Sequence, residues 1–150
     1  MWLDIWDNPS VAFDSPLTLD LETTIRNTIG KNKASSFCPD NKLVCIGLKK
    51  LDKDPHVIDP SAIADFTKWM ESQGSVLMIG QNIKFDLLWL MRQYPDLRWN
   101  LHKFCVWDTQ LAEYLITGQE HKMASLDELA MKYGGTLKDD RIKEFWKAGV

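Results

Sequence analysis

The chain has 150 residues and a net charge of −3, and its apolar and charged contents are ordinary for a globular protein. The length suits one domain with a sizeable core, and the charge excludes a protein with a basic field over its whole surface. Three scattered cysteines show neither zinc nor disulfide spacing, and no apolar run approaches the roughly 20 residues of a membrane span. We therefore expect a reducing, cytoplasmic compartment and no membrane contact.

The first predicted element is a strand over residues 16–22, in the stretch PLTLDLETT. Strand side chains alternate between two faces, so its leucines share one face, and Asp20 and Glu22 lie side by side on the other. Adjacent like charges repel, and neither can be buried cheaply without a partner. One interpretation is a solvated pair on an exposed face of a sheet, and the other is a functional site.

A polar loop over residues 25–42 follows, which is long for a compact domain, and long loops are often functional. Its Lys31 and Lys33 could meet phosphates, although a short charge cluster is usually just solvated. The remaining predicted elements are the strands 43–51, 56–59, 75–80 and 105–107 and the helices 60–73, 83–94, 109–117, 126–134 and 138–148.

Polar residues mark where several of these helices begin. Asp59 is predicted to cap a helix that has Pro60 at its first position. Asn82 is predicted to cap the helix that follows the next strand. Ser125 and Glu128 have the spacing of a capping box.

The order of the elements predicts an α/β fold. Three strands come first, which favours a meander, and helix, strand, helix and strand follow, which is typical of crossover units. We therefore predict a mixed central β-sheet, made of a three-strand meander plus crossover strands and flanked by helices. The whole of residues 1–150 is expected to form a single domain.

Sites in open α/β sheets gather at strand ends, and Asp86 stands just past the strand 75–80. If the strands 16–22 and 75–80 are neighbours, Asp20, Glu22 and Asp86 converge. Three close carboxylates need a cation, and oxygen ligands alone favour Mg²⁺ or Mn²⁺ together with a phosphoryl substrate. Two such ions can activate a water and stabilise the leaving oxygen of an in-line displacement.

Plainer interpretations exist for each of the residues near this edge. Asp86 could merely stabilise a helix N-terminus, and Asn82 could be a cap and nothing more. Asp108 precedes a predicted helix start at Thr109 and is therefore expected to be a cap before it is a metal ligand. Phe85 is expected to belong to the core rather than to a substrate platform.

The ordered set of motifs resembles the DEDD 3′→5′ exonucleases of the ribonuclease H-like fold. Asp20-Leu21-Glu22-Thr23 matches the first motif of that family, and Asn82-Ile83-Lys84-Phe85-Asp86 matches the second. WDTQLAEYLITG and SLDELAMKYGG resemble the helices that follow in these proteins. The resemblance covers nearly the whole chain from Leu17 onward and is greatest to the proofreading domain of family-A DNA polymerases and to related phage exonucleases.

The resemblance implies a catalytic role for three carboxylates and a pair of Mg²⁺ or Mn²⁺ ions. Asp20 would bridge both ions, Glu22 would bind the ion that carries the attacking water, and Asp86 would support the second ion.

The resemblance also implies four residues that bind the substrate. Thr23 and Asn82 would contact the terminal nucleotide, and Phe85 would buttress the site. Leu21, between the two acids, would contact the terminal base or sugar.

The chain departs from the family pattern in one respect. A third motif, Tyr-x-x-x-Asp or His-x-x-x-Asp, is expected on a further helix, and the sequence contains neither. The domain is therefore expected to be truncated before its last helix and to lack a fourth carboxylate. We expect these 150 residues to bind divalent metal weakly and to cleave poorly.

Three functions are compatible with these motifs. The first is a proofreading-type exonuclease that shortens a single-stranded DNA 3′ end, alone, fused to a polymerase or within a replisome, in a bacterial or phage-infected cytoplasm. The second is an RNA-trimming exonuclease of the same fold, because no feature of the sequence reports contacts to a 2′-hydroxyl. The third is a catalytically impaired module that only binds nucleic acid.

Overall fold

The computed structural model describes residues 16–26, 30–51, 53–72, 76–97 and 104–139. The chain divides into two compact units, residues 1–109 and residues 110–150, and each is described by itself. Among the described residues, no helix is both long and apolar enough to cross a membrane.

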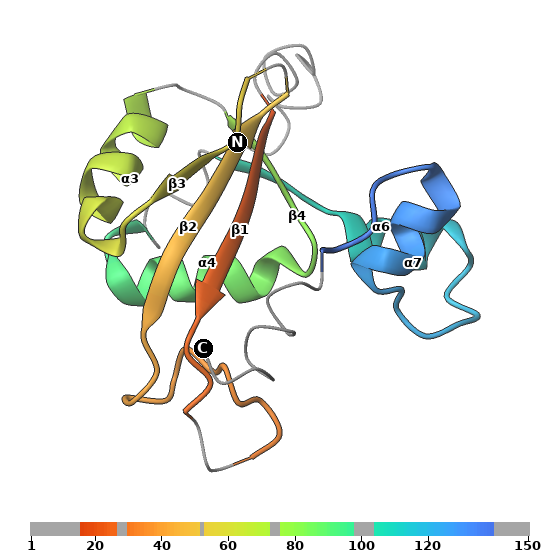
Figure 1. Ribbon diagram of the computed structural model, residues 1–150, viewed down its shortest axis with the longest axis horizontal. Coiled ribbons are helices and arrows are strands. Elements are labelled where there is room, and N and C mark those ends of the chain that lie inside the picture. The colour runs from red at the N-terminus through yellow and green to blue at the C-terminus, as the bar shows by residue number, and fades with distance from the viewer. Residues whose placement is uncertain (1–15, 27–29, 52, 73–75, 98–103, 140–150) are drawn as a thin grey trace. The chain divides into compact units, whose positions relative to one another are not determined.

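The first unit is built on a five-stranded mixed sheet in the order β3-β2-β1-β4-β5 (Figure 1). Strands β1, β2 and β3 form an antiparallel meander, and β4 and β5 are added parallel to β1. The predicted mixed sheet is therefore confirmed. The strands are β1 (Leu17–Thr23), β2 (Leu43–Lys50), β3 (His56–Ile58), β4 (Val76–Gly80) and β5 (Phe104–Asp108).

Strand β1 confirms the alternation that its sequence predicts. Leu17, Leu19 and Leu21 are buried on one face, whereas Asp20 and Glu22 are exposed on the other. Strand β4 is different, because four of its five residues are buried, as expected for a strand that is covered on both faces.

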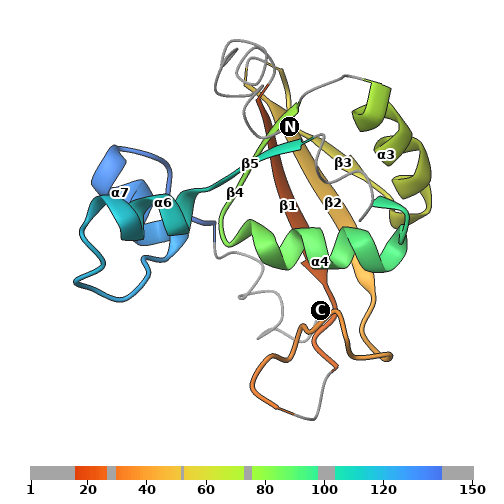
Figure 2. The same cartoon turned by 180° about the vertical axis from the view of Figure 1, so that it is seen from behind.

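Helix α4 (Ile83–Gln93) crosses one face of the sheet, over β1 and β2 (Figures 1 and 2). Its Trp89 and Leu90 are fully buried in the core. There they belong to the same buried cluster as Leu19, Ile46 and Met78 of the strands. This packing holds α4 firmly against the sheet, so the first turn of the helix has a fixed position at the sheet's edge.

The predicted helix 60–73 begins with a turn of 3₁₀-helix, η1 (Pro60–Ala62), and continues as α3 (Ile63–Ser72). The Asp59 carboxylate accepts a hydrogen bond from the N–H of Ser61 at 2.8 Å, so Asp59 is a cap as predicted. Proline suits this first position because its φ is fixed near the helical value and the N–H that it lacks would have no partner within the helix.

The second unit contains α7 (Leu126–Tyr133) and, apart from its first residue, α6 (Thr109–Ile116). The predicted capping box is present, because Ser125 and Glu128 bond reciprocally at the start of α7. Gly134 ends α7 with a left-handed φ of 74°, a conformation that glycine adopts without steric cost.

One predicted element lies almost wholly outside the described residues. The helix expected at 138–148 falls mostly within residues 140–150, which the structure does not describe. The two described residues of that range, Lys138 and Asp139, have no regular secondary structure.

Candidate functional site

The sheet brings the two candidate motifs to one edge. Strands β1 and β4 are parallel neighbours, with Leu17 opposite Met78 and Thr18 opposite Ile79. The sequence-based condition that these strands be adjacent is therefore met. Because parallel strands end at the same edge, the acids near the end of β1 lie on the side where β4 passes into α4.

One hydrogen bond joins the motifs. The backbone N–H of Leu21 donates to Oδ1 of Asp86 at 3.0 Å, across 65 residues of sequence. The pairing of β1 with β4 ends at Thr18 and Ile79, which leaves the N–H of Leu21 available to the helix. Because Leu21 lies between Asp20 and Glu22, this bond fixes the Asp86 carboxylate beside the stretch of β1 that carries both acids.

The environment of Asp86 disfavours its charged form. Its side chain is only 3% exposed. Burial, the nearby Asp20 carboxylate and, to a smaller extent, Asp108 raise the pKa of Asp86 to about 7, against the opposing effect of the Leu21 hydrogen bond. The edge therefore concentrates negative charge that a bound cation would relieve.

The predicted three-carboxylate group is only partly assembled. Asp20 and Asp86 interact electrostatically, whereas Glu22 is not among the groups that shift the pKa of Asp86. Within the part of the chain that the structure describes, no three His, Cys, Asp or Glu side chains are grouped so as to hold one metal ion. The donor chemistry nevertheless fits Mg²⁺ or Mn²⁺, because it consists of carboxylate oxygens. Asp20 and Glu22 are exposed, so both can reorient without disturbing the core.

Asn82 is the N-cap residue of α4, as predicted, but its side chain does not make the capping hydrogen bond that this position would favour. The physical reason is its left-handed backbone, with φ 54° and ψ 43°, whereas a capping side chain normally needs an extended backbone. Its carbonyl oxygen accepts from the N–H of Phe85 at 2.9 Å. The side chain of Asn82 is exposed, at the same edge as Asp86.

The end of β5 holds this turn in place. The Asp108 carboxylate accepts from the N–H of Asn82 at 3.1 Å. The Thr109 hydroxyl donates to the side-chain oxygen of Gln81 at 2.5 Å and lies 3.2 Å from the carbonyl oxygen of Gly80. Sequence reasoning assigned Asp108 to its own helix and missed this contact. The available signal was that Asp108 ends a strand parallel to β4, directly opposite Gly80.

The comparison with protein families agrees with this geometry. A family model described as 3′-5′ exonuclease matches residues 10–146. The chain belongs to this 3′-5′ exonuclease family. The resemblance inferred from the motifs is thereby confirmed, as are the α/β fold of ribonuclease H-like exonucleases and the general assignment as a nuclease, a hydrolase. Among curated proteins, none matches the chain.

Three further residues were predicted to contact the substrate of this exonuclease, and the structure shows where each of them lies. The Leu21 side chain lies in the core and its N–H is committed to Asp86. Thr23 ends β1, just past a shift in register between Glu22 and Thr23. Phe85 is half-buried and packs against the core beside Asp86. Their contacts to a substrate stay predictions.

Proposed function

We propose that the chain is a two-metal-ion 3′→5′ exodeoxyribonuclease that removes nucleotides from a single-stranded DNA 3′ end, as a proofreading enzyme does. The observation that carries this proposal is the hydrogen bond from the Leu21 N–H to Asp86. It joins the two motifs on which the resemblance rests, and it ties a buried carboxylate to the strand that carries Asp20 and Glu22.

Asp20, Glu22 and Asp86 would hold the Mg²⁺ or Mn²⁺ ions. When bound, such ions lower the pKa of a water and stabilise the departing 3′-oxygen. The protein's own contribution is positional. Leu21 orients the Asp86 carboxylate, and the packing of α4 on the sheet keeps this carboxylate near Asp20 before any substrate arrives.

The terminal nucleotide would be held by the residues around these acids. The exposed amide of Asn82 offers both a donor and an acceptor at this edge, on a backbone that Asp108 holds. Thr23 and Phe85 flank the acids in sequence, and Leu21 lies between two of them. A frayed single strand suits such a site, because stacking and backbone contacts do not require a paired base. A DNA polymerase domain or replisome is the partner we propose.

The experiment measures metal binding and cleavage on the same protein. A single-stranded DNA labelled at its 5′ end is incubated with Mn²⁺, and the melting temperature is followed with and without Mn²⁺. We expect stepwise shortening from the 3′ end and a rise in melting temperature. Shortening should be slow, because the sequence contains no Tyr- or His-x-x-x-Asp motif.

The matched variant changes Asp20, Glu22 and Asp86 together to Ala, and the exposed Asp65→Ala on α3 is its control. We expect the triple variant to lose shortening by roughly 10³-fold and to lose the Mn²⁺-dependent rise, because metal binding to the folded state alone stabilises it. Identical behaviour of native and triple-variant proteins would overturn the proposal. Faster shortening of a matched RNA would replace DNA by RNA as the substrate.

A further inference from the structure

The long loop between β1 and β2 is organised around one buried side chain. Asn41 is fully buried. Its amide oxygen accepts from the N–H of Arg26 at 2.6 Å and from the hydroxyl of Thr24 at 3.3 Å. Its amide nitrogen donates to the carbonyl oxygens of Lys33 at 2.9 Å and Ser35 at 3.0 Å. A single asparagine thus ties the two ends of the loop to its middle.

Helix α4 fixes the same loop from the side. The Arg92 guanidinium and the Trp89 indole donate to four carbonyl groups of the loop, and the guanidinium lies 5.0 Å from the centre of the Trp89 ring. The accepting carbonyl oxygens belong to Ala34, Ser36, Cys38 and Pro39, at distances between 2.8 and 3.2 Å. The loop is therefore attached to the helix that also carries Asp86.

The large apolar side chain of Phe37, on this loop, is exposed to solvent. Phe37 is 80% exposed, although its N–H donates to the Ser35 hydroxyl at 3.2 Å and the carbonyl groups on both sides of it are bonded to Arg92. A single exposed phenylalanine is ordinary on a protein surface. Here the backbone that carries it is fixed, so a ligand that stacks on the ring would lose little affinity to ordering of the loop.

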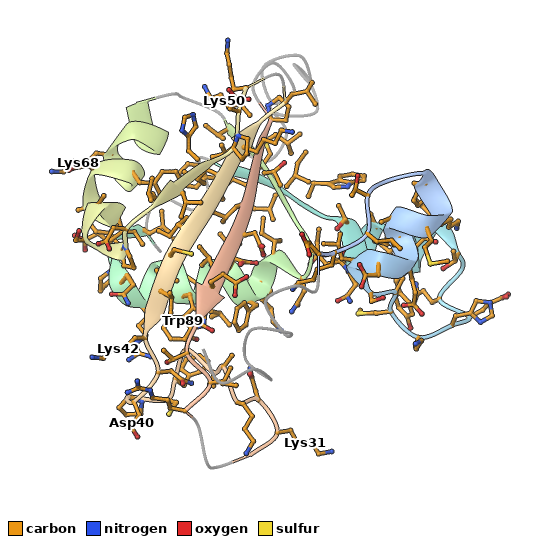
Figure 3. The ribbon with its side chains drawn as sticks, in the orientation of Figure 1. Lys31, Asp40, Lys42, Lys50, Lys68 and Trp89 are labelled. Carbon is orange, nitrogen blue, oxygen red and sulfur yellow. The ribbon has the colours of Figure 1, made fainter. Side chains whose placement is uncertain are left out.

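The loop also differs in charge from the rest of the chain. Residues 24–42 contain four basic residues and one acidic residue, a net charge of +3 in a chain whose net charge is −3. Lys31 and Lys42 point outward from the loop, into solvent (Figure 3), and Lys33 is exposed as well. The loop lies just beyond the arrowhead of β1 (Figure 1), so this basic segment borders the end of the sheet that carries Asp20 and Glu22.

We propose that the loop 30–42 binds the single-stranded DNA beyond the terminal nucleotides, with Phe37 stacked on a base and Lys31, Lys33 and Lys42 near phosphates. An exposed aromatic ring among basic side chains is the combination that recognises single-stranded nucleic acid without regard to sequence. The proposal rests on the proposed function, because it places the strand at the edge where the nuclease residues lie. The loop then supplies affinity, and the carboxylates supply the chemistry.

The test measures binding apart from cleavage. A fluorescent single-stranded DNA with a blocked 3′ end is titrated by anisotropy in EDTA, at several salt concentrations, with the native chain and two variants. Phe37→Ala should weaken binding about tenfold and leave the salt dependence unchanged, because it removes stacking but no charge. Changing Lys31, Lys33 and Lys42 together to Gln should lower the salt slope by about 2, because three phosphate contacts are lost.

Each variant has a control in which an exposed apolar residue or three exposed lysines are changed elsewhere on the surface. Val57→Ala removes an exposed apolar side chain of β3, and changing Lys49, Lys53 and Lys68 together to Gln removes three exposed lysines outside the loop. Both controls should bind as the native chain does. If the loop variants bind like the controls while the native chain shortens DNA, this inference fails and the proposed function stands. If the native chain neither binds nor shortens DNA, both fail.

Discussion

Two carboxylates that the fold nearly buries, Asp86 and Glu113, have opposite electrostatic surroundings. Asp86 is 3% exposed and Glu113 is 8% exposed. Glu113 bonds to the Lys132 ammonium at 2.6 Å and to the Tyr133 hydroxyl at 2.7 Å, and these contacts hold its pKa below its ordinary value. Asp86, in contrast, has its pKa raised to about 7 by burial and by Asp20.

The difference distinguishes a structural acid, Glu113, from the acid that we propose to be functional, Asp86. Glu113 lies on α6 and receives its counter-charge from Lys132 on α7, so the fold itself completes the group. Asp86 accepts backbone hydrogen bonds and faces further negative charge, and none of the described groups that shift its pKa is a cation. Buried groups with strongly shifted pKa values and no counter-charge are typical of sites whose partner arrives from solution.

The largest expected effect concerns Asp86 and pH. Its pKa is about 7 in the folded chain against an ordinary value of 3.8, so the folded state holds this proton more tightly between those values. The free energy of unfolding should therefore fall as pH rises from 4 to 7, by on the order of 3 kcal/mol. Asp86→Asn, which keeps an acceptor for Leu21 but has no charge, should abolish this part of the pH dependence. Urea unfolding in EDTA at several pH values measures both proteins.

Subtracting the pH profile of Asp86→Asn from that of the native chain removes the contributions of titrating groups that do not interact with Asp86. Addition of Mn²⁺ at pH 8 should stabilise the native chain more than Asp86→Asn, because the variant keeps Asp20 and Glu22 but loses one of the three proposed carboxylate ligands. If the free energy of unfolding changes equally with pH in the native chain and in Asp86→Asn between pH 4 and 7, the distinction between Asp86 and Glu113 is lost.

A smaller effect is expected at Asp108, which has two separate interactions on the Asp86 side of this comparison. It adds negative charge near Asp86, and it accepts from the N–H of Asn82. Asp108→Ala removes both contributions, and Asp108→Asn removes only the charge. If Asp108 acts by positioning Asn82, Ala should slow exonuclease turnover about tenfold and Asn should retain most of it, because one hydrogen bond is lost only in the first variant.

The amide proton of Asn82 distinguishes this explanation from a general loss of structure. Its hydrogen exchange should accelerate in Asp108→Ala and stay slow in Asp108→Asn. Equal loss of turnover in the two variants would instead assign the effect to charge.

The sequence predicts those parts of the molecule that depend on local patterns. The alternation of leucines in β1, the cap at Asp59 and the capping box at Ser125 all follow from neighbouring residues, and all three are present. The adjacency of β1 and β4 was only a condition for the acids to converge, and the structure meets that condition. The candidate carboxylates could therefore be named before their spatial arrangement was known.

The features that the sequence did not reveal depend on contacts between distant segments. The bond from Leu21 to Asp86 requires that the β1–β4 pairing stop early, and nothing local encodes where it stops. Asn82 adopts a left-handed backbone at a position where an asparagine cap was expected. Asn41 looks like an ordinary loop residue, yet it is fully buried and bonded at both ends of its amide. Only tertiary structure determines which of several plausible roles each side chain takes.

The smallest expected effect is at Glu113. Gln at this position can still accept hydrogen bonds but cannot pair with the Lys132 charge, so the melting temperature should fall by only a few degrees at pH 7. Because the pKa of Glu113 is lowered, its contribution is present above the ordinary glutamate value and is lost as pH falls through the lowered pKa. The difference between native chain and Glu113→Gln should therefore shrink towards pH 3, the opposite sense to that at Asp86.

Glu120 is an exposed glutamate of the same unit, so Glu120→Gln is the matched control. This control should leave the melting temperature unchanged. Mn²⁺ should stabilise Glu113→Gln as much as the native chain, because a carboxylate whose partners come from its own fold has no part in holding an ion. A reduced Mn²⁺ response in Glu113→Gln would show that a carboxylate with its own counter-charge also takes part in binding the ion. Absence of counter-charge would then no longer be sufficient to identify the functional carboxylates of this exonuclease.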